Sequence, residues 1–208
     1  MQALTMKVEE QVLQPEAEEN EKSRRMEMSK KDKFSMETGK KLVKSIARLF
    51  CYASLKMQLK DSGSRIKCAG KVKLLGTKNI KMGDAIHFGK NVQLHTEGRG
   101  YIHIGTNVKI GNGVKLFSQY SIIIEDNTHI ENYVIIRDAV KMKEGTLPQT
   151  SAKPVYIGKK VWIGKGTRIH AGVTIGHGAT LSANSVVTHS IPPQVIAGGA
   201  PAKVIINR

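Results

Sequence analysis

Aliphatic side chains return at every sixth position in the C-terminal part of the chain. Around the stretch VWIGKGTRIHAGVTIGHGATLSANSVV, residues 161–187, the series runs Ile157, Ile163, Ile169, Ile175, Leu181 and Val187. An amphipathic helix spaces apolar residues by three and four, and a half-buried strand places them at every second position. A strict period of six fits neither pattern alone, so it indicates a repeated structural unit.

The same period continues upstream, where it is interrupted at regular points. Apolar residues six apart form the groups Met82, Phe88, Leu94; Ile104, Ile110, Leu116; and Ile124, Ile130, Ile136. The interval to the next group is ten residues after Leu94, eight after Leu116 and 21 after Ile136. Extra residues therefore enter at one point of the unit, and the longest insertion runs from Arg137 to Tyr156.

Three short strands per unit explain this spacing. If three strands joined by tight turns make one triangular coil, the sixth-position apolar residue of each strand points inward and stacks on its counterpart in the next coil. One coil could not bury that face, so several must stack. The chain is therefore predicted to be all-β, with a parallel β-helix of about five coils after a partial turn around KVKLLGTKNI.

The N-terminal part has a different pattern. Residues 1–35 are rich in Glu, Lys, Met and Ser, which predicts a flexible charged tail. Residues 36–64 contain GKKLVKSIARLFCYASLKMQLK, whose apolar residues share one helical face, and this predicts a basic amphipathic α-helix and linker. That face would pack on the body or another subunit, or make peripheral contact with a membrane. The β-helical domain is expected over residues 65–208.

Charge and cysteine content restrict the partners and the compartment. The formal net charge is +16, and residues 34–208 contain 26 basic and nine acidic side chains. This excess favours anionic partners such as phosphorylated cofactors, nucleotide sugars or acidic polysaccharide. Nucleic acid is not favoured, because stacking aromatic residues are few and no nucleic-acid-binding module is visible. Only Cys51 and Cys68 occur, no metal-ligand spacing is present, and no apolar run could span a membrane, so a cytoplasmic protein is expected.

The C-terminal motifs resemble a known family. The segment VWIGKGTRIHAGVTIGHGATLSANSVVTHSIPPQVIAGGAPAKVI looks like the closing coils of the hexapeptide-repeat acyltransferases. The similarity extends over roughly residues 65–206, and the branch resembles polysaccharide and sugar O-acetyltransferases, relatives of the galactoside and maltose acetyltransferases. The resemblance implies a left-handed parallel β-helix and a homotrimer that binds acetyl-CoA in clefts between subunits.

Candidate cofactor contacts also follow from the resemblance. They are small corner residues whose backbone groups would pair with the pantetheine arm, and two lysines that would meet phosphates: Gly164, Lys165, Gly172, Ser182, Ala183, Thr188 and Lys203.

The catalytic position departs from the family pattern. The family's general base is a loop histidine five residues after the last inward aliphatic, and that position holds Lys141 here. A lysine acts as a base only where burial or neighbouring cations lower its pKa by several units. The remaining candidates are His129, His170 and Asp138, of which Asp138 would orient the base or the substrate. His129 precedes the inward Ile130, so it is expected to point outward.

Three functions remain in view. The first is an acetyl-CoA-dependent O-acetyltransferase acting on a hydroxyl of a sugar or polysaccharide precursor. The second is a hexapeptide-repeat trimer that has lost catalysis and serves as a scaffold or ligand binder, which the missing histidine motivates. The third is an N-acyltransferase acting on an amino sugar.

Overall fold

A computed structural model describes residues 59, 63–140 and 151–207. Contacts divide the chain into Met1–Ile46 and Ala47–Arg208, and all described residues belong to the second unit. The predicted tail, nearly all of the predicted amphipathic helix, and Lys141 lie outside the described residues.

Short strands form three parallel sheets, the faces of a triangular prism. Face A holds β3 (Ile80–Met82), β6 (Tyr101–Ile104), β9 (Ser121–Ile124), β14 (Val155–Ile157) and β17 (Thr174–Ile175). Face B holds β1 (Lys67–Cys68), β4 (His87–Phe88), β7 (Lys109–Ile110), β10 (His129–Ile130), β15 (Trp162–Ile163), β18 (Thr180–Leu181) and β20 (Val195–Gly199). Face C holds β2 (Val72–Leu75), β5 (Val92–Thr96), β8 (Lys115–Ser118), β11 (Ile135–Arg137), β16 (Arg168–Ile169) and β19 (Val186–Val187).

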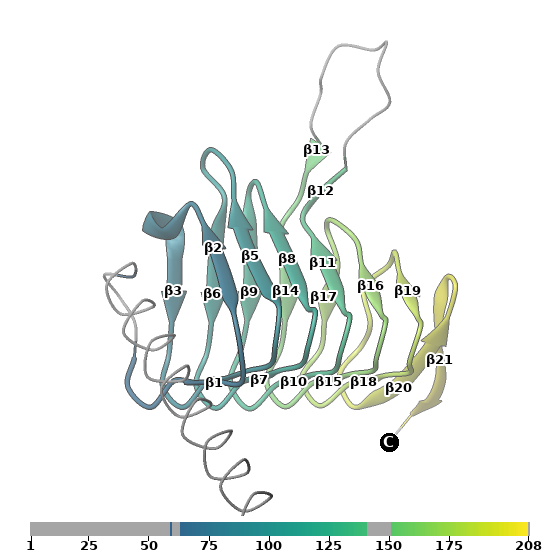
Figure 1. Cartoon of the computed structure of the whole chain (residues 1–208). Helices are drawn as coiled ribbons and strands as arrows, with labels where there is room; N and C mark the ends of the chain where they lie inside the picture. The colour runs from purple at the N-terminus through teal and green to yellow at the C-terminus, as the bar shows by residue number, and fades with distance from the viewer. Residues whose placement is uncertain (1–58, 60–62, 141–150, 208) are drawn as a thin grey trace, which may run out of the picture. The chain divides into compact units, whose positions relative to one another are not determined.

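The strands follow one another in a fixed order along a stack of coils (Figure 1). Each coil runs from face B through face C to face A, and strands of successive coils pair in parallel. This confirms the predicted all-β parallel β-helix. The segment predicted as a partial turn supplies β2 and the 3-10 turn Thr77–Asn79, and the five strands of face A, from β3 to β17, match the five predicted coils that follow it.

The interior is the predicted column of aliphatic side chains. On face B, Ile130 is in register with Ile110 of the coil before it and Ile163 of the coil after it. All three are at most 3% exposed, as are the equivalent residues Leu116, Ile136 and Ile169 of face C. The period of six thus arises because each strand contributes one side chain at the same depth of every coil.

Polar side chains close the corners between faces B and C. Asn112 Oδ1 accepts the backbone N–H of Lys90 at 2.7 Å, and Asn132 Oδ1 accepts the N–H of Asn112 at 2.7 Å. In these two coils, an amide that leaves the strand ladder is therefore capped by a side chain of the next coil.

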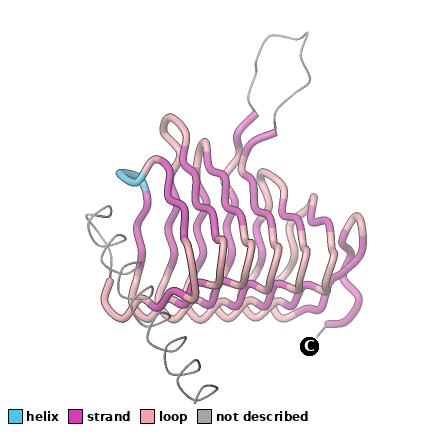
Figure 2. The backbone as a smooth tube through the Cα atoms, viewed as in Figure 1, coloured by secondary structure: helices cyan, strands magenta, loops and turns pink. Residues whose placement is uncertain are grey.

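Extra residues leave the coil at the corner between faces C and A, as predicted (Figure 2). The turns after β5 and β8 lie there, and so does the excursion after β11. That excursion begins and ends with a small antiparallel pair, β12 (Ala139–Val140) and β13 (Ser151–Ala152). Because all insertions share this corner, they lie beside one edge of face C.

The C-terminal strands end the stack. β21 (Ala202–Asn207) pairs antiparallel with β20, which itself pairs in parallel with β18. Within the described part of the chain, no helix is long and apolar enough to cross a membrane.

Candidate functional site

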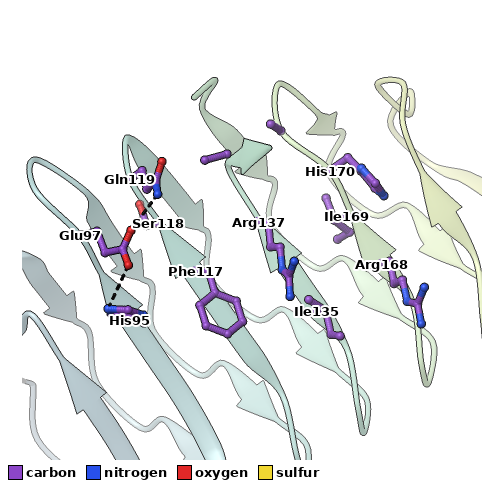
Figure 3. A pocket seen from close by; sticks show the side chains of 12 residues that line it. His95, Glu97, Phe117, Ser118, Gln119, Ile135, Arg137, Arg168, Ile169 and His170 are labelled. Atoms are coloured by element: carbon purple, nitrogen blue, oxygen red, sulfur yellow. Dashed lines mark hydrogen bonds and ion pairs between the residues drawn. The ribbon is translucent and has the colours of Figure 1, made fainter. Parts of the chain in front are cut away.

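A cavity of about 730 Å³ lies on the outer side of face C, next to the corner that carries the insertions. Figure 3 shows its lining residues, which come from β5, β8, β11, β12 and β16 and from the turns that follow β5, β8 and β16. They are His95, Glu97, Phe117, Ser118, Gln119, Ile135, Arg137, Ala139, Arg168, Ile169, His170 and Ala171.

One row of side chains forms the floor of this cavity. His95 is in register with Phe117, and Phe117 is in register with Arg137. His170 follows Ile169, just as Arg137 follows the paired Ile136. Each of these residues comes directly after an inward aliphatic, so the alternation of a β-strand turns it outward. The solenoid thereby stacks an imidazole, a phenyl ring, a guanidinium and a second imidazole on successive coils.

His95 belongs to a polar network at one end of the row. Its Nε2 lies 3.8 Å from Glu97 Oε1, and Gln119 Nε2 donates to Glu97 Oε2 at 2.7 Å. The imidazole also packs edge-on against Phe117, with ring centroids 6.0 Å apart. The Glu97 carboxylate, itself held by Gln119, thus lies beside the imidazole of His95. This pairing of a histidine with a carboxylate is the arrangement expected of a general base.

Two arginines lie farther along the cavity. The Arg137 guanidinium carbon is 5.1 Å from the centre of the Phe117 ring, in cation–π geometry. Arg168 lies on the neighbouring strand β16. Among the described residues, no carboxylate is within ion-pair distance of either guanidinium.

Asp138, which we expected to orient the base, is fully buried at the edge of the cavity. Its carboxylate accepts the Ser118 hydroxyl at 2.7 Å, the Gln119 N–H at 2.8 Å and the Tyr120 N–H at 2.9 Å. These contacts fix the turn between β8 and β9. The described contacts of Asp138 are therefore those of a residue that positions Gln119, and through Gln119 the carboxylate of Glu97.

The predicted histidines lie on different faces. His170 is exposed and borders the face C cavity, whereas Lys141 lies outside the described residues. His129 lies on face B and points outward, as predicted. Its ring stacks on Trp162 with centroids 4.1 Å apart, and its Nε2 is 3.1 Å from Glu131 Oε1. His129 lines a separate shallow hollow of about 220 Å³.

The residues expected to bind the cofactor fall into three groups. Gly164, Lys165, Ser182 and Ala183 share the corner between faces B and C, where a Cβ on Gly164 would lie 2.5 Å from the Ala183 nitrogen. Gly172 and Thr188 lie at the corner between faces C and A, and Lys203 is exposed in β21. Within one chain these groups do not form a single pocket.

His95 and Glu97 were missed by the sequence analysis, although a signal for His95 exists. Once the inward series Leu94, Leu116, Ile136 and Ile169 is aligned, the residues that follow its members fall into one outward column. The sequence does not show how far Gln119 and Glu97 are from each other, because that distance depends on the shape of two turns. No cluster of three or more potential metal ligands occurs among the described residues.

Comparisons with known proteins agree with the repeat and the fold. Residues 154–189 match the family model described as bacterial transferase hexapeptide (six repeats). No protein of curated function matches the chain in sequence.

Solved structures share the fold. AntD, an N-acyltransferase from Bacillus cereus in complex with dTDP and 3-hydroxybutyryl-CoA, is 22% identical with a TM-score of 0.67, over 74% of this chain and 85% of AntD. The polySia-specific acetyltransferase NeuO is 22% identical with a TM-score of 0.53, over 72% and 79% of the two chains. The hexapeptide-repeat acetyltransferase VCA0836 from Vibrio cholerae, in complex with acetyl coenzyme A, is 26% identical with a TM-score of 0.57, over 75% of each chain.

Proposed function

The chain is a hexapeptide-repeat protein with the fold of the hexapeptide acyltransferases, and on that premise we propose that it is an acyl-CoA-dependent acyltransferase. Its acceptor binds in the face C cavity. The observation that carries this assignment is the His95–Glu97–Gln119 network. It places the imidazole of His95 in the face C cavity, beside a carboxylate that Gln119 holds.

Acetyl-CoA is the proposed acyl donor. The solved neighbours in complex with acetyl coenzyme A or 3-hydroxybutyryl-CoA support a CoA thioester. Gly164, Lys165, Gly172, Ser182, Ala183, Thr188 and Lys203 remain the proposed contacts of this substrate. Because they occupy separate corners of one chain, we propose that neighbouring copies in a homotrimer complete the site.

His95 acts as the proton acceptor in place of the absent loop histidine. An acceptor hydroxyl attacks the thioester carbonyl, a C–O bond forms as the hydroxyl proton moves to the imidazole, and the C–S bond then breaks. The proton finally passes to the CoA thiolate, which leaves as the thiol. Glu97, which is held by Gln119, orients the imidazole toward the acceptor. His170, at the other end of the row, is the alternative base.

A saccharide hydroxyl is the proposed acceptor group. NeuO, described as specific for polySia, supports a saccharide acceptor, whereas AntD, an N-acyltransferase, supports the alternative of an amine. The same base would serve both reactions. Alkali treatment of the product separates them, since an ester is cleaved and an amide is retained.

The test is release of free CoA thiol from acetyl-CoA in the presence of a saccharide panel. The wild type is compared with His95→Gln and His170→Gln, and His177→Gln serves as the matched control because His177 lies at the corner between faces A and B. We expect His95→Gln to lower kcat by about 10²-fold to 10⁴-fold, the usual contribution of a general base. Full activity in His95→Gln would reject the assignment of the base, and no acetyl-CoA binding by the wild type would favour the scaffold function.

A cytoplasmic location and peripheral membrane contact through residues 40–60 also remain proposals. The basic composition of that segment supports the membrane contact. Flotation of the full chain with anionic and neutral vesicles tests it, because contact through basic residues requires anionic lipid.

A further inference from the structure

We propose that the acceptor carries a carboxylate or phosphate group and that Arg137 and Arg168 bind it. This inference rests on the proposed function, because it names the class of saccharide that enters the same cavity. It also makes Arg137 and Arg168 specificity-determining residues, distinct from the proton-accepting His95.

The backbone positions of Arg137 and Arg168 allow both guanidinium groups to contact the same anion. Ile135 is in register with Arg168, and Arg137 lies two residues beyond Ile135 on the same strand. One step across the sheet and two residues along it separate the two Cα atoms by about 8 Å. Both residues line the cavity. Figure 3 shows them on neighbouring strands. An arginine side chain is long enough for both to reach a group between them, and its planar fork suits carboxylate and phosphate oxygens.

The charge balance of the cavity also favours an anion. Its charged or titratable lining residues are Arg137, Arg168, His95, His170 and a single acid, Glu97. Glu97 is already held by Gln119 and faces His95, at the other end of the cavity. Asp138 is fully buried and its carboxylate is occupied by the turn after β8. The arginines therefore have no acidic partner among the described residues.

Phe117 holds one of the two arginines in place. Arg137 stacks over this ring, which lies between His95 and Arg137 in the row of face C. Two strand spacings, about 10 Å, separate the backbone positions of His95 and Arg137. An acceptor of that length can keep its charged group at the arginines while one of its hydroxyl groups reaches His95.

The phosphates of CoA are a second possible source of the anion, so the experiment must separate donor from acceptor. Steady-state kinetics and equilibrium binding by NMR are measured for sugar pairs that differ only in the charged group: glucuronate with glucose, galacturonate with galactose, and glucose 6-phosphate with glucose. The proteins are the wild type, Arg137→Gln and Arg168→Gln. Lys160→Gln is the matched control, because it removes one positive charge from an exposed residue at the corner between faces A and B.

We expect the wild type to prefer at least one charged sugar over its neutral partner. Each arginine substitution should raise KM and Kd for that sugar about 10-fold to 100-fold, while kcat and the KM for acetyl-CoA stay within about twofold of wild type. Lys160→Gln should match the wild type.

Three results would overturn the inference. The first is equal use of charged and neutral sugars. The second is a rise confined to the KM for acetyl-CoA, which would assign the arginines to the donor phosphates. The third is binding of no charged sugar. Failure of the proposed function looks different: charged sugars would bind through the arginines, yet no CoA would be released with any acceptor.

Discussion

Replacing Asp138 with alanine tests whether this residue stabilises the fold or takes part in the chemistry. The carboxylate is fully buried and accepts the N–H groups of Gln119 and Tyr120, at 2.8 and 2.9 Å. Alanine leaves both amides without this acceptor; the amide of the half-buried Gln119 left unpaired costs about 1–3 kcal/mol, whereas water can reach the amide of Tyr120, a residue that is 57% exposed. The Ser118 hydroxyl keeps an acceptor, because its one proton can turn to the Tyr101 carbonyl, 3.0 Å away. We therefore expect Asp138→Ala to lower the free energy of unfolding by about 1–3 kcal/mol.

Urea unfolding followed by circular dichroism measures this loss as a shift in the midpoint. Asp126→Ala is the control, because the Asp126 carboxylate also accepts a corner amide, Thr106 N–H at 2.8 Å, but its side chain is 35% exposed. Water can replace that acceptor, so a loss of only about 1 kcal/mol is expected. Asp138→Asn keeps one acceptor oxygen and should fall between wild type and Asp138→Ala. A midpoint for Asp138→Ala equal to that of the wild type, together with lost activity, would refute the structural role.

Two further predictions concern the corners and the surface of face B. A methyl group on Gly164 would lie 2.5 Å from the Ala183 nitrogen and 2.7 Å from the Leu181 oxygen, so Gly164→Ala should lower Tm by several degrees more than Gly98→Ala. Gly98 has φ +58° and open space around it, so alanine there causes only backbone strain of about 1 kcal/mol, and equal Tm values for the two variants would contradict this. Desolvation, and then the charges of Lys67 and Lys109, lower the pKa of His87 below 6.5. The unfolded chain therefore binds a proton at a higher pH than the folded chain, and this contribution to stability falls as pH decreases below about 6.5. His87→Gln should flatten the dependence of Tm on pH between the lowered pKa and 6.5, and an unchanged slope would contradict the effect.

The fold could be predicted from sequence because its main interaction is periodic. Ile130 and its neighbours recur at a fixed spacing, since every strand buries one side chain at the same depth. The corner that carries the insertions was also predictable, because extra residues at that corner do not change the spacing of six between the inward residues within a coil. The partial turn that contains β2 follows the pattern less strictly, since Val72 and Leu74 are only partly buried.

The site was less predictable because it depends on relations between coils. His95 is two residues from Glu97, but the residue that holds Glu97 is Gln119, 22 positions away in the next turn. Asp138 was expected near the chemistry from its place in the motif, and only the structure shows that Ser118, Gln119 and Tyr120 occupy its carboxylate. His129 was predicted to point outward, yet its stacking on Trp162 follows from a register that spans the long insertion.

The most direct test of the central claim is a crystal structure of the full chain with bound CoA. The account predicts that the CoA sulfur lies in the face C cavity, close enough to His95 for a hydroxyl group to fit between the sulfur and the imidazole. A sulfur that lies beside Trp162 and His129, with no His95 of any subunit nearby, would contradict it.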